Sequence, residues 1–262
     1  MKKNITTGTK QLIVENNNGI LSIVLNNPKY KNALSEDLTP YLRKILKNIS
    51  KDKTIKALLI RGKGDSFCSG GNIKKMNAKE MKKPSLKKRV AELEKKQKQL
   101  TGLLYSLNIP TIAVITGAAA GAGFALALAC DLRIGNLKAF FVSNYSRIGL
   151  SGDYGISWFL NNIVGESKAK EIMFLNNRIY SSEAKELGLL NMIIEKNFEK
   201  ELKKLVSNLS NQSPIALKYI KKNILEAKKS SLNTLLKQEA LHLIKCTETE
   251  EHKKAVENFK KK

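Results

Sequence analysis

Two short segments without a polar side chain constrain the fold of this chain most: Ala57-Leu58-Leu59-Ile60 and Ile112-Ala113-Val114-Ile115. A strand that is apolar on both faces must be covered on both faces, which is typical of a parallel sheet flanked by helices. Each segment is followed by a glycine-bearing turn and then by a helical pattern. Because strand, turn and helix alternate in this way, the sequence predicts an α/β fold with a parallel-sheet core.

Other segments extend this pattern in both directions. Residues 12–25 are typical of a hairpin that turns at Asn16-Asn17-Asn18-Gly19. An amphipathic helix follows, with Ser35 as its predicted N-cap. Further strands are predicted near 132–134, 140–142 and 190–194. Further helices are predicted over about 156–163 and from Ser181 to Leu187, where Gly188 would end the helix.

The last quarter of the chain has only helical patterns. The sequence therefore divides into a core of residues 1–197 and a helical C-terminal region of residues 198–262. An apolar stripe through Leu202, Leu205, Val206 and Leu209 requires a partner surface. We therefore expect the C-terminal region to mediate oligomerisation.

Composition limits the classes of partner and compartment. A net charge of +24 over 262 residues favours an anionic partner, such as nucleic acid, an anionic membrane or a polyphosphate group. Lysines are spread along the whole chain, however, and the dense stretch 79–98 has a helical period that predicts a solvated helix face, so nucleic acid is not favoured. The three cysteines form no Cys-x-x-Cys pair, which favours a reducing cytoplasm without disulfides or zinc. Residues 113–130 are uncharged but rich in Gly and Ala, so strand, turn and buried helix explain them better than a membrane span.

Two glycine-rich turns carry the main indication of function: Phe67-Cys68-Ser69-Gly70-Gly71-Asn72-Ile73 and Gly117-Ala118-Ala119-Ala120-Gly121-Ala122-Gly123-Phe124. Small residues allow backbone N–H groups to approach a ligand closely. Two such amides directed at one carbonyl oxygen would stabilise an enolate or a tetrahedral oxyanion. This pattern predicts an enzyme.

Other catalytic classes lack their residues. The two histidines, His242 and His252, lie in the helical tail, so a Ser-His-Asp or Cys-His mechanism would have no base near the turns. The spacing Gly117-x-x-x-Gly121-x-Gly123 is not the dinucleotide fingerprint, and the chain has no Walker phosphate loop.

Four runs, in their order along the chain, resemble the crotonase, or enoyl-CoA hydratase/isomerase, superfamily: residues 67–73, 116–131, 179–191 and 255–259. The resemblance covers nearly the whole chain. It implies a spiral of ββα units with a C-terminal helical trimerisation region, assembled as a trimer or a dimer of trimers. It also implies an acyl-CoA substrate, with coenzyme A as part of that substrate and no metal or separate cofactor.

The resemblance places the two oxyanion-hole amides on Gly71 and Ala122. It also implies contacts with the acyl-CoA for a wider set of residues, of which the last would belong to a neighbouring subunit: Asn32, Ala33, Leu34, Gly70, Ile73, Gly121 and Phe259. Ser69, Asn72 and Tyr145 are further candidates, because a polar side chain near the acyl pocket could orient the substrate.

The chain departs from the family where the chemistry is decided. Family hydratases place two Glu residues at positions that hold Ala125 and Tyr145 here, and neither can act as a carboxylate base. Asp153 stands where several family isomerases carry an acid, although an Asp before a helix is often only an N-cap. We therefore expect an isomerase of unsaturated or epoxidised acyl-CoA that moves a proton through Asp153. A hydratase with this single carboxylate, a non-catalytic acyl-CoA-binding protein and an RNA-binding family member remain alternatives.

Overall fold

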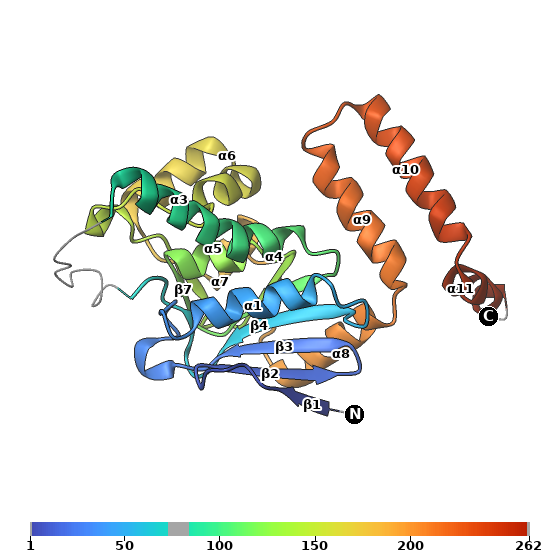
Figure 1. The fold of residues 1–262 in the computed structure, drawn as a ribbon, viewed down its shortest axis with the longest axis horizontal. Helices are drawn as coiled ribbons and strands as arrows, with labels where there is room; N and C mark the ends of the chain where they lie inside the picture. The colour runs from blue at the N-terminus through green and yellow to red at the C-terminus, as the bar shows by residue number, and fades with distance from the viewer. Residues whose placement is uncertain (1, 73–83, 261–262) are drawn as a thin grey trace.

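The computed structural model of the protein describes residues 2–72 and 84–260 (Figure 1). Its larger sheet has seven strands in the order β1-β2-β3-β4-β6-β8-β11. The first three strands are antiparallel, and β3, β4, β6, β8 and β11 are parallel, as the apolar segments predict. Their bounds are Lys2–Ile5, Leu12–Asn17, Ile20–Leu25, Ala57–Gly62, Thr111–Ile115, Leu132–Gly135 and Met192–Ile193.

A smaller sheet of four strands, in the order β10-β9-β7-β5, packs beside the first. The strands β4, β6 and β8 of the larger sheet are each followed directly by a strand of the smaller one, and the chain then enters a helix. This repetition is the predicted ββα spiral. The bounds of β5, β7, β9 and β10 are Ser66–Cys68, Ala118–Ala120, Phe140–Val142 and Ile179–Tyr180.

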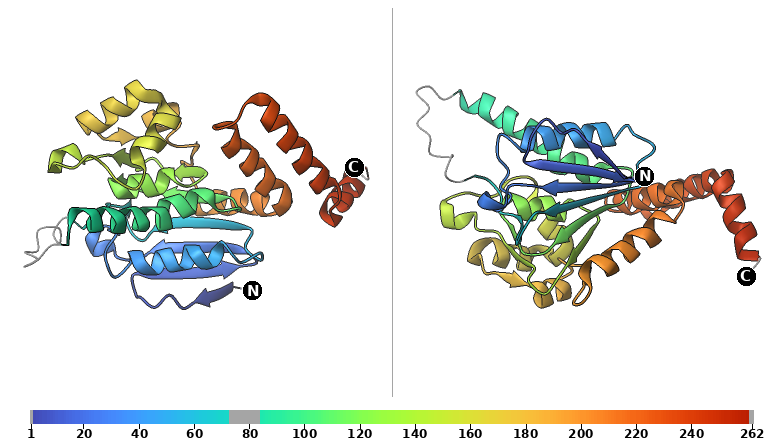
Figure 2. Two further views of the ribbon diagram at one scale, coloured as in Figure 1. Left: turned by 45° about the horizontal axis from the view of Figure 1, so that its top comes forward. Right: turned by 90° about the horizontal axis from the view of Figure 1, so that it is seen from below.

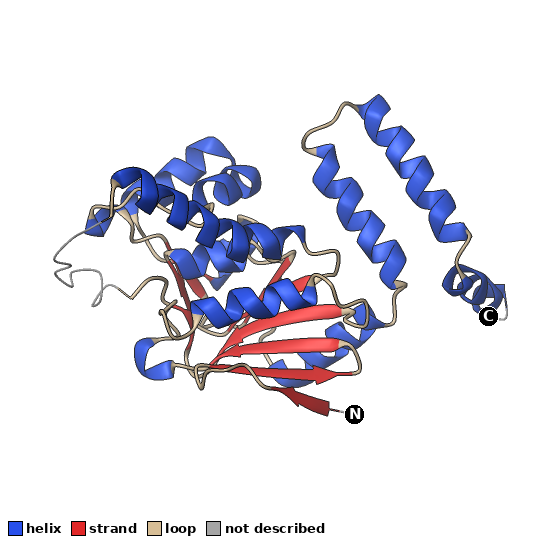
Figure 3. Cartoon of the chain, viewed as in Figure 1, coloured by secondary structure: helices blue, strands red, loops and turns tan. Residues whose placement is uncertain are grey.

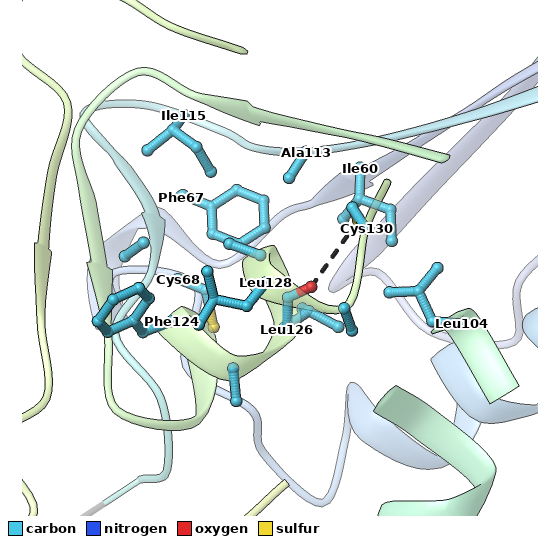
Figure 4. Close-up of a cluster of buried hydrophobic side chains, with 14 of the residues drawn as sticks. Ile60, Phe67, Cys68, Leu104, Ala113, Ile115, Phe124, Leu126, Leu128 and Cys130 are labelled. Carbon is cyan, nitrogen blue, oxygen red and sulfur yellow. Dashed lines mark hydrogen bonds between the residues drawn. The ribbon is translucent and has the colours of Figure 1, made fainter. Parts of the chain in front are cut away.

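Helices cover one face of the larger sheet, as Figure 3 shows by colour. The main core lies between them and the sheet, where Phe67 and Phe124 pack with Ile60, Ala113 and Ile115 (Figure 4). The bounds of α1, α3, α4, α5, α6 and α7 are Thr39–Ile49, Leu86–Gln97, Leu103–Ser106, Ala122–Leu128, Ile156–Leu175 and Ser181–Glu186.

The opposite face of the same sheet is covered by α8, Phe198–Ser210. Leu59, Ile112 and Val114 point to this face and form a second buried cluster with Leu202 and Val206. The expectation that the stripe on this helix needs another subunit is therefore wrong. The stripe covers the chain's own sheet, because strands that are apolar on both faces require a second layer.

Three further helices extend away from the core as an arm, as Figures 1 and 2 show from different sides: α9, Pro214–Ala227; α10, Leu232–Thr247; and α11, Glu250–Lys260. Lys221 ties the base of the arm to the core, since its Nζ lies 2.8 Å from Asp131 Oδ2 and donates to the Ile109 carbonyl at 3.2 Å. The arm exposes an apolar surface that includes Ile220, Ile224, Leu236, Leu241, Leu243 and Ile244. The predicted oligomer interface therefore has a candidate surface on the arm, and the oligomeric state stays a prediction.

Several predicted boundaries shift in the structure. The hairpin of residues 12–25 is confirmed, and Asn18 and Gly19 adopt positive φ in its turn. The first helix begins at Thr39 rather than after Ser35, whose hydroxyl donates to Gln11 Oε1 instead of capping the helix. Ser181 is likewise not a cap, because its hydroxyl donates to the Leu137 carbonyl.

Two lengths also differ from expectation. The helix α6 runs on to Leu175 through a break at Gly165, whose φ of 77° and ψ of 167° are not helical. The strand β11 is shorter than predicted. Within the described ranges, no helix is long and apolar enough to cross a membrane, and residues 113–130 hold β6, β7 and α5 instead.

Candidate active site

The two glycine-rich turns lie against each other at the ends of β5 and β7. A Cβ atom on Gly70, where φ is +85°, would lie 2.7 Å from the Ala120 carbonyl oxygen and 3.0 Å from the Ala122 nitrogen. A Cβ atom on Gly123 would lie 2.3 Å from the Cys68 carbonyl oxygen. Since these neighbours are backbone atoms, only glycine permits so close an approach at both positions.

Within residues 2–72 and 84–260, the turns leave two backbone amides without an acceptor. Ala122 is the first residue of α5, so its N–H has no partner within the helix. Leu34 forms an isolated bridge with Gly71, in which the Leu34 N–H donates to the Gly70 carbonyl at 2.8 Å. Among the loop and side-chain hydrogen bonds of residues 2–72 and 84–260, neither the Gly71 nor the Ala122 N–H is a donor. As far as the described residues go, both amides can donate to a ligand.

Both residues line one cavity of about 80 Å³. Its walls come from the two turns, from the segment after β9 and from the loop before α6, and they comprise Ser69, Gly71, Ala120, Gly121, Ala122, Ser143, Asn144, Tyr145, Ile148, Leu150 and Asp153. A larger apolar cavity of about 420 Å³ lies between α6 and α9, but it contains neither the free amides nor Asp153. We place the candidate site at the smaller cavity because the reactive groups meet there.

Asp153 and Tyr145 form a hydrogen-bonded pair in this cavity. The Tyr145 hydroxyl donates to Asp153 Oδ1 at 2.6 Å. Burial raises the pKa of Asp153 above its ordinary value, and the hydrogen bond from Tyr145 offsets only part of that effect. Burial, and then the Asp153 charge, raise the pKa of Tyr145, so the phenol stays neutral and acts as a donor.

Asp153 is not the cap of the helix that follows it. The N-cap of α6 is Gly155, and no side chain caps this helix. Asp153 contributes only its backbone carbonyl, which accepts from the Ile156 N–H at 3.2 Å. The carboxylate therefore has no capping role and is directed into the cavity wall beside Tyr145.

Asn32 is near the site, but its side chain is fully engaged. It is buried, its Oδ1 accepts from the Asn27 N–H, and its Nδ2 donates to the Lys63 and Ser66 carbonyls at 3.0 Å and 2.8 Å. Both amide hydrogens are thus used to hold this loop against the start of the first glycine turn. Asn32 can influence a ligand only through its backbone or through the residues that it positions.

The other predicted contacts lie at different places around the cavity or outside the described residues. Leu34 is half-buried and pairs with the first turn, whereas Ala33 is buried. Ser69 and Gly121 line the cavity; the Ser69 hydroxyl donates to the Tyr30 carbonyl, and Gly70 packs directly behind the second turn. Asn72 is half-buried at the end of the first turn. Ile73 and the side chain of Phe259 lie outside the described part of the chain.

The sequence prediction missed Ser143 and Asn144. Both line the cavity, and Asn144 has a φ of 56° with a buried Oδ1 that has no partner in the described structure. The Ser143 hydroxyl donates to Asn176 Oδ1 at 2.6 Å. An Asn directly after a strand is a weak sign of positive φ, but it gives no indication of a site. Across the described ranges, no group of three or more His, Cys, Asp or Glu side chains could hold a metal ion.

Comparison with known proteins places this geometry in a family. Residues 15–262 match the family described as enoyl-CoA hydratase/isomerase. The chain is 34% identical over 152 residues to the 1,2-epoxyphenylacetyl-CoA isomerase of Escherichia coli, and 32% identical over 157 residues to a probable peroxisomal enoyl-CoA hydratase 1 of Arabidopsis thaliana. These matches span 58% and 59% of this chain, and 57% and 55% of the relatives. The chain thus spans little more than half the length of these curated relatives.

Solved structures match over a longer range. An enoyl-CoA hydratase from Bacillus anthracis superposes with a TM-score of 0.88 at 25% identity, covering 96% of both chains. A putative enoyl-CoA hydratase from Streptomyces coelicolor superposes with a TM-score of 0.90 at 26% identity, covering 98% of this chain and 94% of the other. With the family match over residues 15–262, these similarities show that the chain belongs to the enoyl-CoA hydratase/isomerase family and has the crotonase fold.

Proposed function

We propose that the protein is a cytoplasmic enzyme that isomerises an unsaturated or epoxidised acyl-CoA. In this proposal Asp153 moves the proton, while the Gly71 and Ala122 N–H groups hold the thioester oxygen. One observation carries the proposal: the carboxylate of Asp153 lines the same small cavity as two backbone amides that have no acceptor in the described protein.

The chemistry follows from the developing charge. When a base removes a proton from the acyl chain, the electron pair moves toward the thioester oxygen, which becomes an enolate oxygen. Each preorganised donor at that oxygen typically contributes about 3–4 kcal/mol of transition-state stabilisation. Protonation at another carbon then releases the isomerised product and regenerates the base.

The environment of Asp153 suits both proton transfers. A general acid-base is most effective when its pKa lies near the working pH, and burial shifts the pKa of Asp153 in that direction. Tyr145 and Ala125 stand where the family pattern of a two-carboxylate hydratase would place Glu. Asp153 is the carboxylate among the residues that line the cavity, which supports isomerisation over two-carboxylate water addition.

Hydration by Asp153 and an ordered water is the second candidate, because relatives at similar identity are described as probable enoyl-CoA hydratases. Mass analysis of the products separates the two reactions, since hydration adds one water to the substrate and isomerisation preserves its mass. Binding of acyl-CoA without turnover would instead favour a non-catalytic protein. Salt-sensitive binding of RNA would favour the nucleic-acid alternative.

The decisive variant is Asp153→Asn, with Asp37→Asn as the matched control at an exposed position away from the cavity. We expect Asp153→Asn to lower turnover by about 10²-fold or more and to leave acyl-CoA affinity nearly unchanged. Solvent deuterium exchange into the acyl chain should be lost in the same variant and kept in the control. Turnover at the wild-type rate in Asp153→Asn would show that another group is the base.

A further inference from the structure

We infer that Tyr145 is a positioning residue for Asp153, so that Oδ2 of the carboxylate is the atom that exchanges a proton with the substrate. This inference rests on the proposed function, because it assigns the proton to one oxygen of the proposed acid-base. Tyr145 lines the cavity, as its predicted contact with the substrate requires, and its hydroxyl is directed to the Asp153 carboxylate.

The phenol holds one of the two carboxylate oxygens. Its hydroxyl donates to Oδ1 at 2.6 Å, and within the described residues no hydrogen bond of a protein group reaches Oδ2. This bond from Tyr145 restricts the rotation of the Asp153 carboxylate and leaves Oδ2 for the substrate.

The phenol is itself held in place. Tyr145 is buried, and its carbonyl accepts from the N–H groups of Ile148 at 3.1 Å and Leu150 at 2.9 Å. A Cβ atom on Gly121 would lie 3.9 Å from Tyr145 Cζ, so the ring packs beside the turn that carries the Ala122 amide. One rigid aromatic ring therefore sets the carboxylate relative to the proposed oxyanion hole.

Few charged groups act on this pair. The phenol of Tyr154 is half-buried next to Asp153, and burial followed by the Asp153 charge raises its pKa. The Arg43 charge lowers the pKa of Tyr154, and the Glu36 charge raises it. Burial raises the pKa of Asp153 itself, and the hydrogen bond from Tyr145 lowers it. Removing the hydroxyl should therefore leave burial unopposed.

The test is Tyr145→Phe, with Tyr154→Phe as the matched control, because the Tyr154 hydroxyl does not bond Asp153. The Asp153 pKa is read from the carboxyl carbon by NMR of Asp-labelled protein, and Asp153→Asn assigns the signal. We expect Tyr145→Phe to raise this pKa by about one to two units, because the variant loses a hydrogen bond to the charged carboxylate. The pH at which turnover falls on the acid side of its pH profile should rise by the same amount. Turnover should fall about tenfold, and KM should change little. Tyr154→Phe should leave all three readings unchanged.

An unmoved Asp153 pKa in folded Tyr145→Phe protein would overturn the inference, whatever Asp153→Asn does. A raised pKa together with full activity of Asp153→Asn would uphold the hydrogen bond but overturn the proton transfer through Oδ2, and with it the proposed function. If Tyr145→Phe does not fold, Tyr145→3-fluorotyrosine keeps the ring and makes the phenol a stronger donor. It should lower the Asp153 pKa, and an unchanged or higher value would again overturn the inference.

Discussion

Replacing Gly70 with Ala should force the two glycine turns apart and reduce turnover. A Cβ atom at this position would lie 2.7 Å from the Ala120 carbonyl oxygen and 3.0 Å from the Ala122 nitrogen. Both are backbone atoms, one at the end of β7 and one at the start of α5, so no side-chain rotation can relieve the contact. One turn must shift relative to the other, which changes the distance between the Gly71 and Ala122 amides that are the proposed donors to the thioester oxygen.

Two free energies contribute to the expected effect. The positive φ of 85° costs an L-residue about 1–2 kcal/mol of stability. Displacing one oxyanion donor costs about 3–4 kcal/mol in the transition state, which corresponds to about a 10²- to 10³-fold loss of turnover. The two effects are separable, because the first appears in the free energy of unfolding and the second in the rate.

Gly188→Ala is the matched control. Its φ of 73° imposes a similar backbone strain, but a Cβ atom there meets only Ile163 at 3.7 Å, an ordinary contact away from the cavity. Denaturant unfolding gives the stabilities, and a thioester turnover assay gives the rates. We expect both variants to lose stability and only Gly70→Ala to lose turnover. Wild-type turnover in a folded Gly70→Ala protein would refute a joint oxyanion hole built from these turns.

Three other predictions follow from the same structure. Because burial raises the pKa of Asp153, the folded state binds the carboxyl proton more tightly than the unfolded state does. The contribution of this proton to the free energy of unfolding is full below the ordinary pKa of 3.8 and is lost as pH rises through the raised pKa. As pH rises through this range, Asp153→Asn should become more stable relative to the wild type. A difference in unfolding free energy between the two proteins that stays constant with pH would contradict this. Calorimetry should detect binding of CoA and acyl-CoA that weakens as salt is added, and no heat at saturating ligand would count against an acyl-CoA site. Light scattering should give the mass of a trimer or hexamer, whereas a monomer would leave the apolar surface of α9 and α10 unexplained.

The parts of the fold that sequence could predict are those with a local signal. The strands at 57–60 and 112–115 are continuous apolar runs, and the hairpin turn carries the Asn-Gly pair that positive φ requires. The close approach of Gly70 and Gly123 to the opposite turn also follows the sequence, because glycine is the residue that allows it. In each case one short segment contains enough information.

The parts that sequence could not predict depend on partners far along the chain. The side-chain amide of Asn32 donates to Lys63 and Ser66, more than thirty residues away, and no local pattern indicates these partners. The stripe on α8 is visible in sequence, but the surface that it covers is not. Tyr145 and Asp153 are eight positions apart, and the segment between them holds only one short 3-10 helix, so no periodicity indicates which side chains meet.

The two-sided larger sheet also has a consequence for synthesis of the chain. One face of β4 and β6 is covered by α1 and α5, which are both synthesised by residue 130. The other face is covered by Leu202 and Val206 of α8, which are synthesised about seventy residues later. Nascent chains that have not reached α8 therefore expose Leu59, Ile112 and Val114 as a bare apolar surface. Such surfaces favour aggregation and engagement by chaperones. A truncation before Phe198 should thus be recovered mainly as insoluble or chaperone-bound protein, whereas one after Ser210 should keep its core folded.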